Sequence, residues 1–173
     1  MKKLVLLAFA IMLASCNQTK IGYVNVENLM KDYKATKVLE TQLKTKQEKI
    51  SKQLDSLQAP FKVKVQNYYQ RAQKMSASAR AKVEKELQQQ QQMLQLNQQQ
   101  AARQLQDENK TESEKITKRV DSLVANFAKA KGYQLILGTS GNGTVMYGDT
   151  KLDVTHQVLD ILNADFDKNS IKH

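Results

Sequence analysis

The chain has 173 residues, of which 40% are hydrophobic and 6% aromatic, with one Pro, six Gly and no Trp. This composition argues against an ordinary globular domain and against an all-β fold, whereas abundant Lys, Gln, Ala, Leu and Glu favour long helices. The formal net charge of +10 allows three kinds of partner, namely nucleic acid, anionic lipid or an acidic protein.

The first residues have the layout of a secretory signal. Lys2 and Lys3 precede an apolar run from Leu4 to Leu13, and small residues follow it. The run is far shorter than the ~20 apolar residues that a transmembrane helix needs. We therefore predict a signal peptide over residues 1–15. Its removal leaves 25 basic against 17 acidic residues, and export disfavours nucleic acid as a partner.

The residues at the predicted cleavage site are more specific than a general signal. Leu13-Ala14-Ser15-Cys16 is similar to the bacterial lipobox, in which the Cys receives a diacylglyceryl group and becomes the mature N-terminus. Cys16 is the only Cys in the chain, so it cannot form an intramolecular disulfide. The alternative is a stray Cys at the end of an ordinary signal. We predict lipidation of Cys16, a polar lipidated leader over residues 16–20, and anchoring to a membrane of a bacterial envelope.

A strand and a long helix are expected next. Ile21 to Val26 is a short β-rich run. From about Glu27 to Met75, apolar residues recur at intervals of three and four, which predicts a helix with a narrow apolar stripe. Lys46 and Lys64 interrupt this stripe. Pro60 lies inside it and predicts a bend, because proline removes a helix hydrogen bond.

A second long helix is expected to run back beside the first. The chain most readily turns at residues 75–80, where Ser76 or Ser78 can cap a new helix. This helix is expected from about Ala79 to Ala130, and Gly132 suits its end. Large apolar residues are sparse between Leu87 and Ile116, where glutamines predominate. We interpret the glutamines as an uncharged solvated face, and we expect the antiparallel, coiled-coil-like hairpin to be flexible because its apolar seam is weak.

The C-terminal part returns to mixed structure. Residues 133–137 and 144–147 are expected to form two strands of a β-hairpin, with its turn at residues 141–143. Asp153 is expected to cap a last helix. The predicted fold is therefore α+β and mostly α. A small body of three strands (residues 21–33 and 120–170) carries a long helical-hairpin arm (residues 34–119, with its tip near 75–80) between strands 1 and 2.

The predicted body is small and would expose sheet edges, so oligomerisation through the sheet is expected. The residues that we assign to this oligomerisation body lie in or beside its strands and in the last turns of the arm: Tyr23, Val24, Leu123, Phe127, Leu135, Leu137, Val145 and Tyr147.

No catalytic arrangement and no cofactor site is evident. His156 and His173 are not spaced as metal ligands, and no glycine-rich phosphate loop is present. The distal arm is unusual in having no acidic residue between Ser56 and Val83. It is either a solvated basic face or a surface that attracts acidic clients or anionic lipid headgroups. The residues assigned to this candidate surface are six cations with nearby aromatic and apolar side chains: Lys62, Lys64, Arg71, Lys74, Arg80, Lys82, Tyr68, Tyr69 and Met75.

Three segments resemble the Skp/OmpH family of periplasmic chaperones. The first is Lys20 to Val26 and the second is the tip-like Met75 to Arg80. The third is the most specific and runs from Lys131 to Leu137, then through residues 143–149, 152–155 and 158–159. The layout is similar over essentially the whole mature chain, whereas the arm matches only in character.

The resemblance implies a non-enzymatic, ATP-independent holding chaperone. Such a protein would be a homotrimer whose three sheets form a barrel-like body, and whose arms enclose unfolded outer-membrane proteins in the periplasm. The lipobox departs from the best-known members, which are soluble. The alternative is a structural lipoprotein that tethers a membrane to another layer of the envelope. The sparse seam favours the holder, because a tether needs rigid length.

Overall fold

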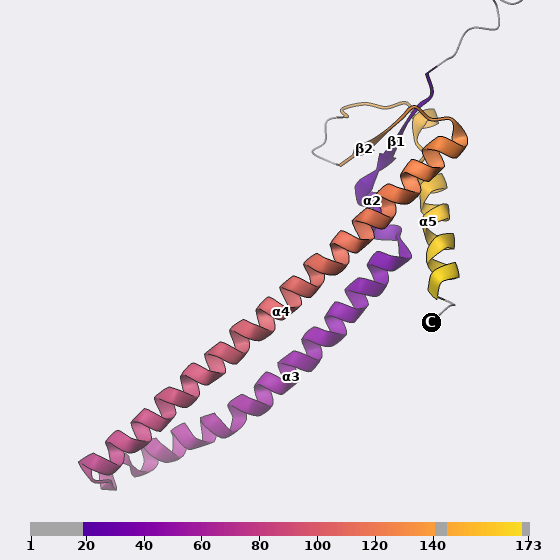
Figure 1. Cartoon of the computed structure of the whole chain (residues 1–173). Helices are drawn as coiled ribbons and strands as arrows, with labels where there is room; N and C mark the ends of the chain where they lie inside the picture. Colours follow the sequence, from indigo (N-terminus) through magenta and orange to yellow (C-terminus); the bar gives the residue numbers. More distant parts are fainter. Residues whose placement is uncertain (1–18, 141–144, 171–173) are drawn as a thin grey trace, which may run out of the picture. The chain divides into compact units, whose positions relative to one another are not determined.

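A computed structural model describes residues 19–140 and 145–170, and the chain divides into two compact units (Figure 1). One unit, the body, combines the residues up to Tyr33 with those from Arg119 onward, and the other, the hairpin, is Lys34–Lys118. The elements in order are β1 (Ile21–Asn25), α2 (Val26–Asp32), α3 (Lys34–Arg71), the short helix η1 (Ala72–Lys74), α4 (Ala77–Lys131), β2 (Leu135–Thr139), the short helix η2 (Thr150–Leu152) and α5 (Thr155–Ser170). The predicted combination of a long helical hairpin and a small sheet is confirmed.

The sheet of the body has two parallel strands among the described residues. In its register, Ile21 lies opposite Leu135 and Asn25 lies opposite Thr139. Parallel strands require a long crossover connection, and here both helices of the hairpin are inserted between them. The other edge of β1 is bridged by Asp153, and the Val154 N–H donates to the Tyr23 carbonyl at 2.9 Å. β1 is therefore the central strand of the body, and β2 is its edge strand.

The prediction of three strands is wrong. Val145, Met146 and Tyr147 form no strand, and Met146 and Tyr147 are 97% and 86% exposed. Strand propensity reflects how well a side chain fits a half-buried sheet surface, and Met146 and Tyr147 meet no such surface within the single chain. Residues 141–144, which include the expected turn, lie outside the described residues.

The core of the body lies between the sheet, α2 and α5. Alternate residues of β1 face opposite sides, and Val24 is buried on the side that packs against these two helices. Leu29 of α2 and Leu162 of α5 are almost completely buried. On the opposite side, Ile21 and Leu135 are 39% and 46% exposed. One face of the sheet is thus covered, while the other presents apolar side chains to solvent.

Two helix ends are formed as the sequence predicts. The Ser76 hydroxyl accepts a hydrogen bond from the Ala79 N–H at 3.2 Å, which caps the start of α4. At the other end, Gly132 has φ +72°, and the Tyr133 N–H reaches back to the Ala128 carbonyl at 2.8 Å. This left-handed glycine with its six-residue hydrogen-bonded loop is a Schellman motif, in which a side chain at Gly132 would be strained.

The first long helix is interrupted where the body ends. Tyr33 has ψ 126°, so the chain leaves helical geometry between α2 and α3. The Tyr33 side chain is 2% exposed, and its ring meets that of Phe166 edge to face, with centroids 6.4 Å apart. Burial of this ring against α5 explains the break, which the helical spacing alone did not indicate.

The hairpin has almost no buried seam. Of its residues, only Leu39 is buried, and the other apolar side chains between Lys34 and Lys118 are half-buried or exposed. α3 continues through Pro60 without a break. Most helix stability in proteins comes from packing of an apolar face, so these helices gain little from each other beyond the turn that contains Leu39.

Candidate functional site

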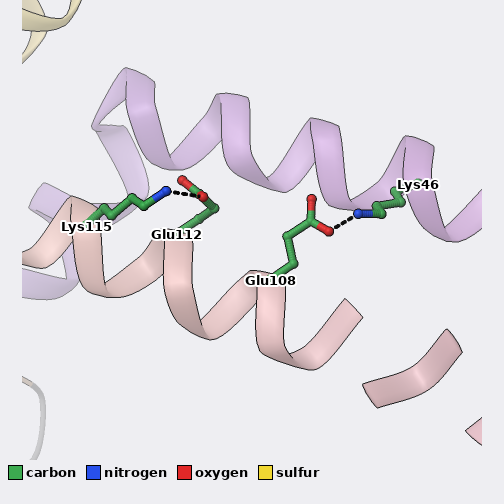
Figure 2. A network of polar contacts seen from close by, with 4 residues as sticks. All are labelled: Lys46, Glu108, Glu112 and Lys115. Carbon is green, nitrogen blue, oxygen red and sulfur yellow. Dashed lines mark hydrogen bonds and ion pairs between the residues drawn. The ribbon is translucent and has the colours of Figure 1, made fainter. Parts of the chain in front are cut away.

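One ion pair links the two helices of the hairpin across the seam. The Lys46 ammonium on α3 contacts the Glu108 carboxylate on α4, and Figure 2 shows both side chains pointing toward each other. On α4 itself, Lys115 and Glu112 pair at 2.7 Å. Lys46 interrupts the apolar stripe, and this arrangement gives it a partner.

A second polar contact lies nearer the tip. The Tyr68 hydroxyl donates to the Glu84 carboxylate, and this hydrogen bond raises the pKa of Tyr68. Both residues are eight positions from Ser76, on opposite sides of the turn. Residues equally distant from the turn of an antiparallel hairpin face each other, so this spacing could have identified Glu84 from the sequence.

A groove of about 260 Å³ lies in the hairpin beside these residues. Its lining includes the candidate residues Lys64, Tyr68, Arg71 and Met75, which are spaced at threes and fours along one side of the chain before the turn. α4 contributes apolar side chains and one carboxylate: Val83, Leu87 and Glu86. The structure thus brings two cations together with an aromatic ring and apolar surface.

A smaller groove of about 200 Å³ follows along the same helices. Lys64 is the one charged residue in its lining. The rest of the lining is apolar or carries amides: Leu57, Pro60, Phe61, Gln90, Met93, Leu94 and Asn97. The sequence pattern does not indicate this groove, because the part of α4 that lines it lies in the glutamine-rich stretch.

The other candidate residues of the arm do not join these two grooves. Lys62, Lys74, Arg80 and Lys82 are exposed and line neither of them. Tyr69 is 73% exposed and lines a third groove with Tyr68, Phe61 and Val65. All six basic residues are exposed, and only Lys64 and Arg71 line a groove.

The residues assigned to the oligomerisation body differ in how deeply they are buried within the single chain. Val24 and Phe127 are buried within the single chain, and the Phe127 ring stacks on Tyr133 at 5.6 Å. Tyr23, Leu123 and Val145 are half-buried. Leu135, Leu137 and Tyr147 are exposed.

Comparison with known proteins identifies the family. The model for the outer membrane protein (OmpH-like) family matches residues 20–162. The chain belongs to the OmpH-like family. This confirms the resemblance inferred from the sequence, and because the family is a chaperone family, it agrees with the prediction of a non-enzymatic protein.

A solved structure agrees at the level of the fold. The chain resembles the crystal structure of a candidate outer membrane chaperone (OmpH-like) from Caulobacter crescentus CB15, with a TM-score of 0.76 at 13% identity. The likeness covers 85% of each chain. No curated protein matches the sequence.

Three further features concern the envelope and metals. Within residues 19–140 and 145–170, none of the helices is long and apolar enough to span a membrane. In the same residues, no group of three or more His, Cys, Asp or Glu side chains is arranged to hold a metal ion. Cys16, the predicted lipidation site, lies outside the described part of the chain.

Proposed function

We propose that this OmpH-like protein is an ATP-independent holding chaperone, which binds unfolded outer-membrane proteins in the periplasm and prevents their aggregation. One observation carries the proposal: the hairpin leaves its apolar side chains accessible. Leu57, Val63, Met93 and Leu96 are 50%, 56%, 63% and 56% exposed. Such side chains, methionine above all, adapt to many partners and suit weak contacts with an unfolded chain.

Charge supports the same function. The distal arm carries six cations and no acidic residue between Ser56 and Val83. A surface of one sign raises the rate at which oppositely charged partners arrive, while apolar contacts determine how long they stay. We propose that the cations capture acidic segments of a client, and that they can also meet anionic lipid headgroups.

Assembly as a homotrimer through the body is part of the proposal. The sheet presents Ile21, Leu135 and Leu137 to solvent on one face, and β2 has a free edge among the described residues. Exposed apolar patches and open strand edges are features that proteins normally cover. Three copies would cover both and would place three hairpins around one space.

Anchoring through a lipid on Cys16 completes the proposal. It is supported by the lipobox-like residues 13–16. Two acyl chains suffice for stable anchoring, whereas a single chain binds only marginally. Cys16→Ser expressed in the native host should leave the membrane fraction. An intact mass with cleavage elsewhere and no lipid on Cys16 would contradict the anchor.

The function is tested by diluting a denatured outer-membrane protein into buffer without nucleotide, with and without the purified full-length protein. We expect the protein to suppress light scattering at about stoichiometric amounts, and added ATP to change nothing. A protein that fails to delay aggregation would contradict the holding function, and would favour the structural tether instead.

A further inference from the structure

Two lysines interrupt the apolar stripe of α3, and they have different environments. Lys46 pairs with Glu108 across the seam. Lys64 has no hydrogen bond or ion pair in the described structure. The residue of α4 that lines both grooves with Lys64 is Gln90, whose amide carries no charge. Glu86 also lines the larger groove but forms no ion pair with Lys64, so the hairpin contains one ion pair across the seam and one seam lysine without a carboxylate partner.

We propose that the missing carboxylate comes from the client, so that the groove at Lys64 is a binding site for an Asp or Glu side chain flanked by apolar residues in an unfolded polypeptide. This inference rests on the proposed holding function and assigns it a discrete site. It differs from general attraction by the arm, because it requires one particular lysine in one particular groove.

The lining of the groove fits this ligand. Phe61, Met93 and Leu94 offer apolar surface, while the amides of Gln90 and Asn97 can donate to a carboxylate. Its volume of about 200 Å³ is below the ~300–1,000 Å³ of small-molecule sites, and it suits one or two side chains.

Charge complementarity favours an acidic residue over other ligands. Lys64 is the one charged residue of this groove, and α3 supplies no acid after Asp55. A cation beside apolar walls attracts a carboxylate more strongly than one that is fully surrounded by water, since the effective dielectric constant is lower there. Lys62 is exposed like Lys64 but lines neither groove, so it is the natural control.

The test supplies the carboxylate within the chain. Gln90→Glu should pair with Lys64 as Glu108 pairs with Lys46, and so should occupy the site. Gln92→Glu places the same carboxylate at an exposed position whose neighbours one turn away, Gln88 and Leu96, are uncharged. Glu86 lies one turn before Gln90, so Glu86→Gln is included in both variants to avoid like-charge repulsion.

The probe is a short unstructured peptide with blocked ends and a central Glu among apolar residues, compared with the same peptide carrying Gln. Fluorescence anisotropy with the full-length protein measures the affinity for each. We expect the wild type to prefer the Glu peptide by about twofold to fivefold, as for an exposed ion pair. Gln90→Glu and Lys64→Met should abolish this preference, while Gln92→Glu and Lys62→Met should keep it.

Equal effects of the Gln90→Glu and Gln92→Glu variants would overturn the inference, because they would show that the position of the added carboxylate does not matter. A wild type that suppresses aggregation yet has no preference for Glu, or binds neither peptide, would also overturn it and leave the holding function intact. A wild type that does not suppress aggregation would instead contradict the proposed function itself.

Discussion

Arg119 on α4 donates to both carboxylate oxygens of Asp165 on α5, with Nε 2.8 Å from Oδ2. This bond lowers the pKa of Asp165 and raises that of Arg119. The Tyr33 ring lies beside the pair and against Phe166. Tyr33 and Arg119 are the two residues at which the chain leaves and re-enters the body. α5 thus contacts both crossing points.

Asp165→Asn should destabilise the body by about 1 kcal/mol, because a two-pronged pair that is partly exposed contributes near the upper end of surface ion pairs. Urea unfolding of the wild type, Asp165→Asn, Arg119→Gln and the double variant gives the coupling energy. Asp121→Asn, on an exposed part of α4, is the matched control and should change little. A coupling energy near zero would show that the Arg119–Asp165 pair does not stabilise the body.

The same pair predicts a pH dependence. The pKa of Asp165 is depressed below its ordinary value of 3.8 in the folded state, mainly by the bond from Arg119. Its stabilisation should therefore be complete above that value and be lost as the pH falls through the depressed pKa. The difference in unfolding midpoint between wild type and Asp165→Asn should shrink in acid. A difference that stays constant down to about pH 2 would contradict this assignment.

Tyr33 should make the stability of the body fall at alkaline pH, whereas Asp165 makes it fall at acid pH. Burial first, and then the charge of Asp165, raise its pKa above 10.0. Stability that depends on the neutral phenol is complete below 10.0 and falls as the pH rises toward the folded pKa. Tyr33→Phe should abolish the part of the alkaline loss that is due to this hydroxyl, which spectrophotometric titration can follow. An unchanged alkaline profile in Tyr33→Phe would contradict it.

Gly148 should not tolerate a side chain. A Cβ there would lie 2.6 Å from a ring carbon of Tyr23. Gly148→Ala should therefore displace the ring or the loop and cost about 1–3 kcal/mol of stability. Gly138→Ala is the milder comparison, since its Cβ would meet only the end of the Val26 side chain, at 3.1 Å. Equal unfolding midpoints for the two variants would show that the loop does not run over Tyr23.

The exposed leucines of β2 provide a test of assembly. Leu135 and Leu137 are 46% and 37% exposed in the single chain, so Leu135→Asn should cost the isolated subunit little. If three copies bury this face, the variant should dissociate while keeping its helical circular dichroism. Sedimentation velocity distinguishes the assembled trimer from the dissociated subunit. A wild type that sediments as a folded monomer at micromolar concentration would contradict the trimer.

Charge reversal tests capture by the arm. Lys62, Lys64, Arg71 and Lys74 changed to Glu should slow association with a denatured outer-membrane protein more than they speed its release. Salt above ~0.1 M, where the Debye length is about 10 Å, should slow the wild type and narrow the difference. Stopped-flow mixing at several ionic strengths measures both rates. Unchanged association would leave these residues as an ordinary solvated face.

The features of this fold that depend on residues close in sequence could be predicted. Gly132 after Lys131 and Ser76 before α4 identify helix ends, because capping depends on residues close in sequence. The break at Tyr33 was not predictable, since it depends on burial against Phe166, which is far away in the chain. The predicted third strand is absent for a related reason, since Met146 and Tyr147 find no surface to pack on within the single chain. At the hairpin, the cations were visible in the sequence, whereas the contrast between Lys46 and Lys64 required knowing which residues of α4 face them.

The pairing of β1 with β2 has a consequence for the order of folding. Ile21 and Leu135 are neighbours in the sheet, yet the whole hairpin is synthesised between them. Contacts between residues so distant in sequence form late, because the intervening loop must first be closed. Formation of α3 and α4, whose contacts around the turn are local, brings the two ends together and shortens that loop. We therefore expect the hairpin to form first, with β1 unpaired until Leu135 to Thr139 reach it.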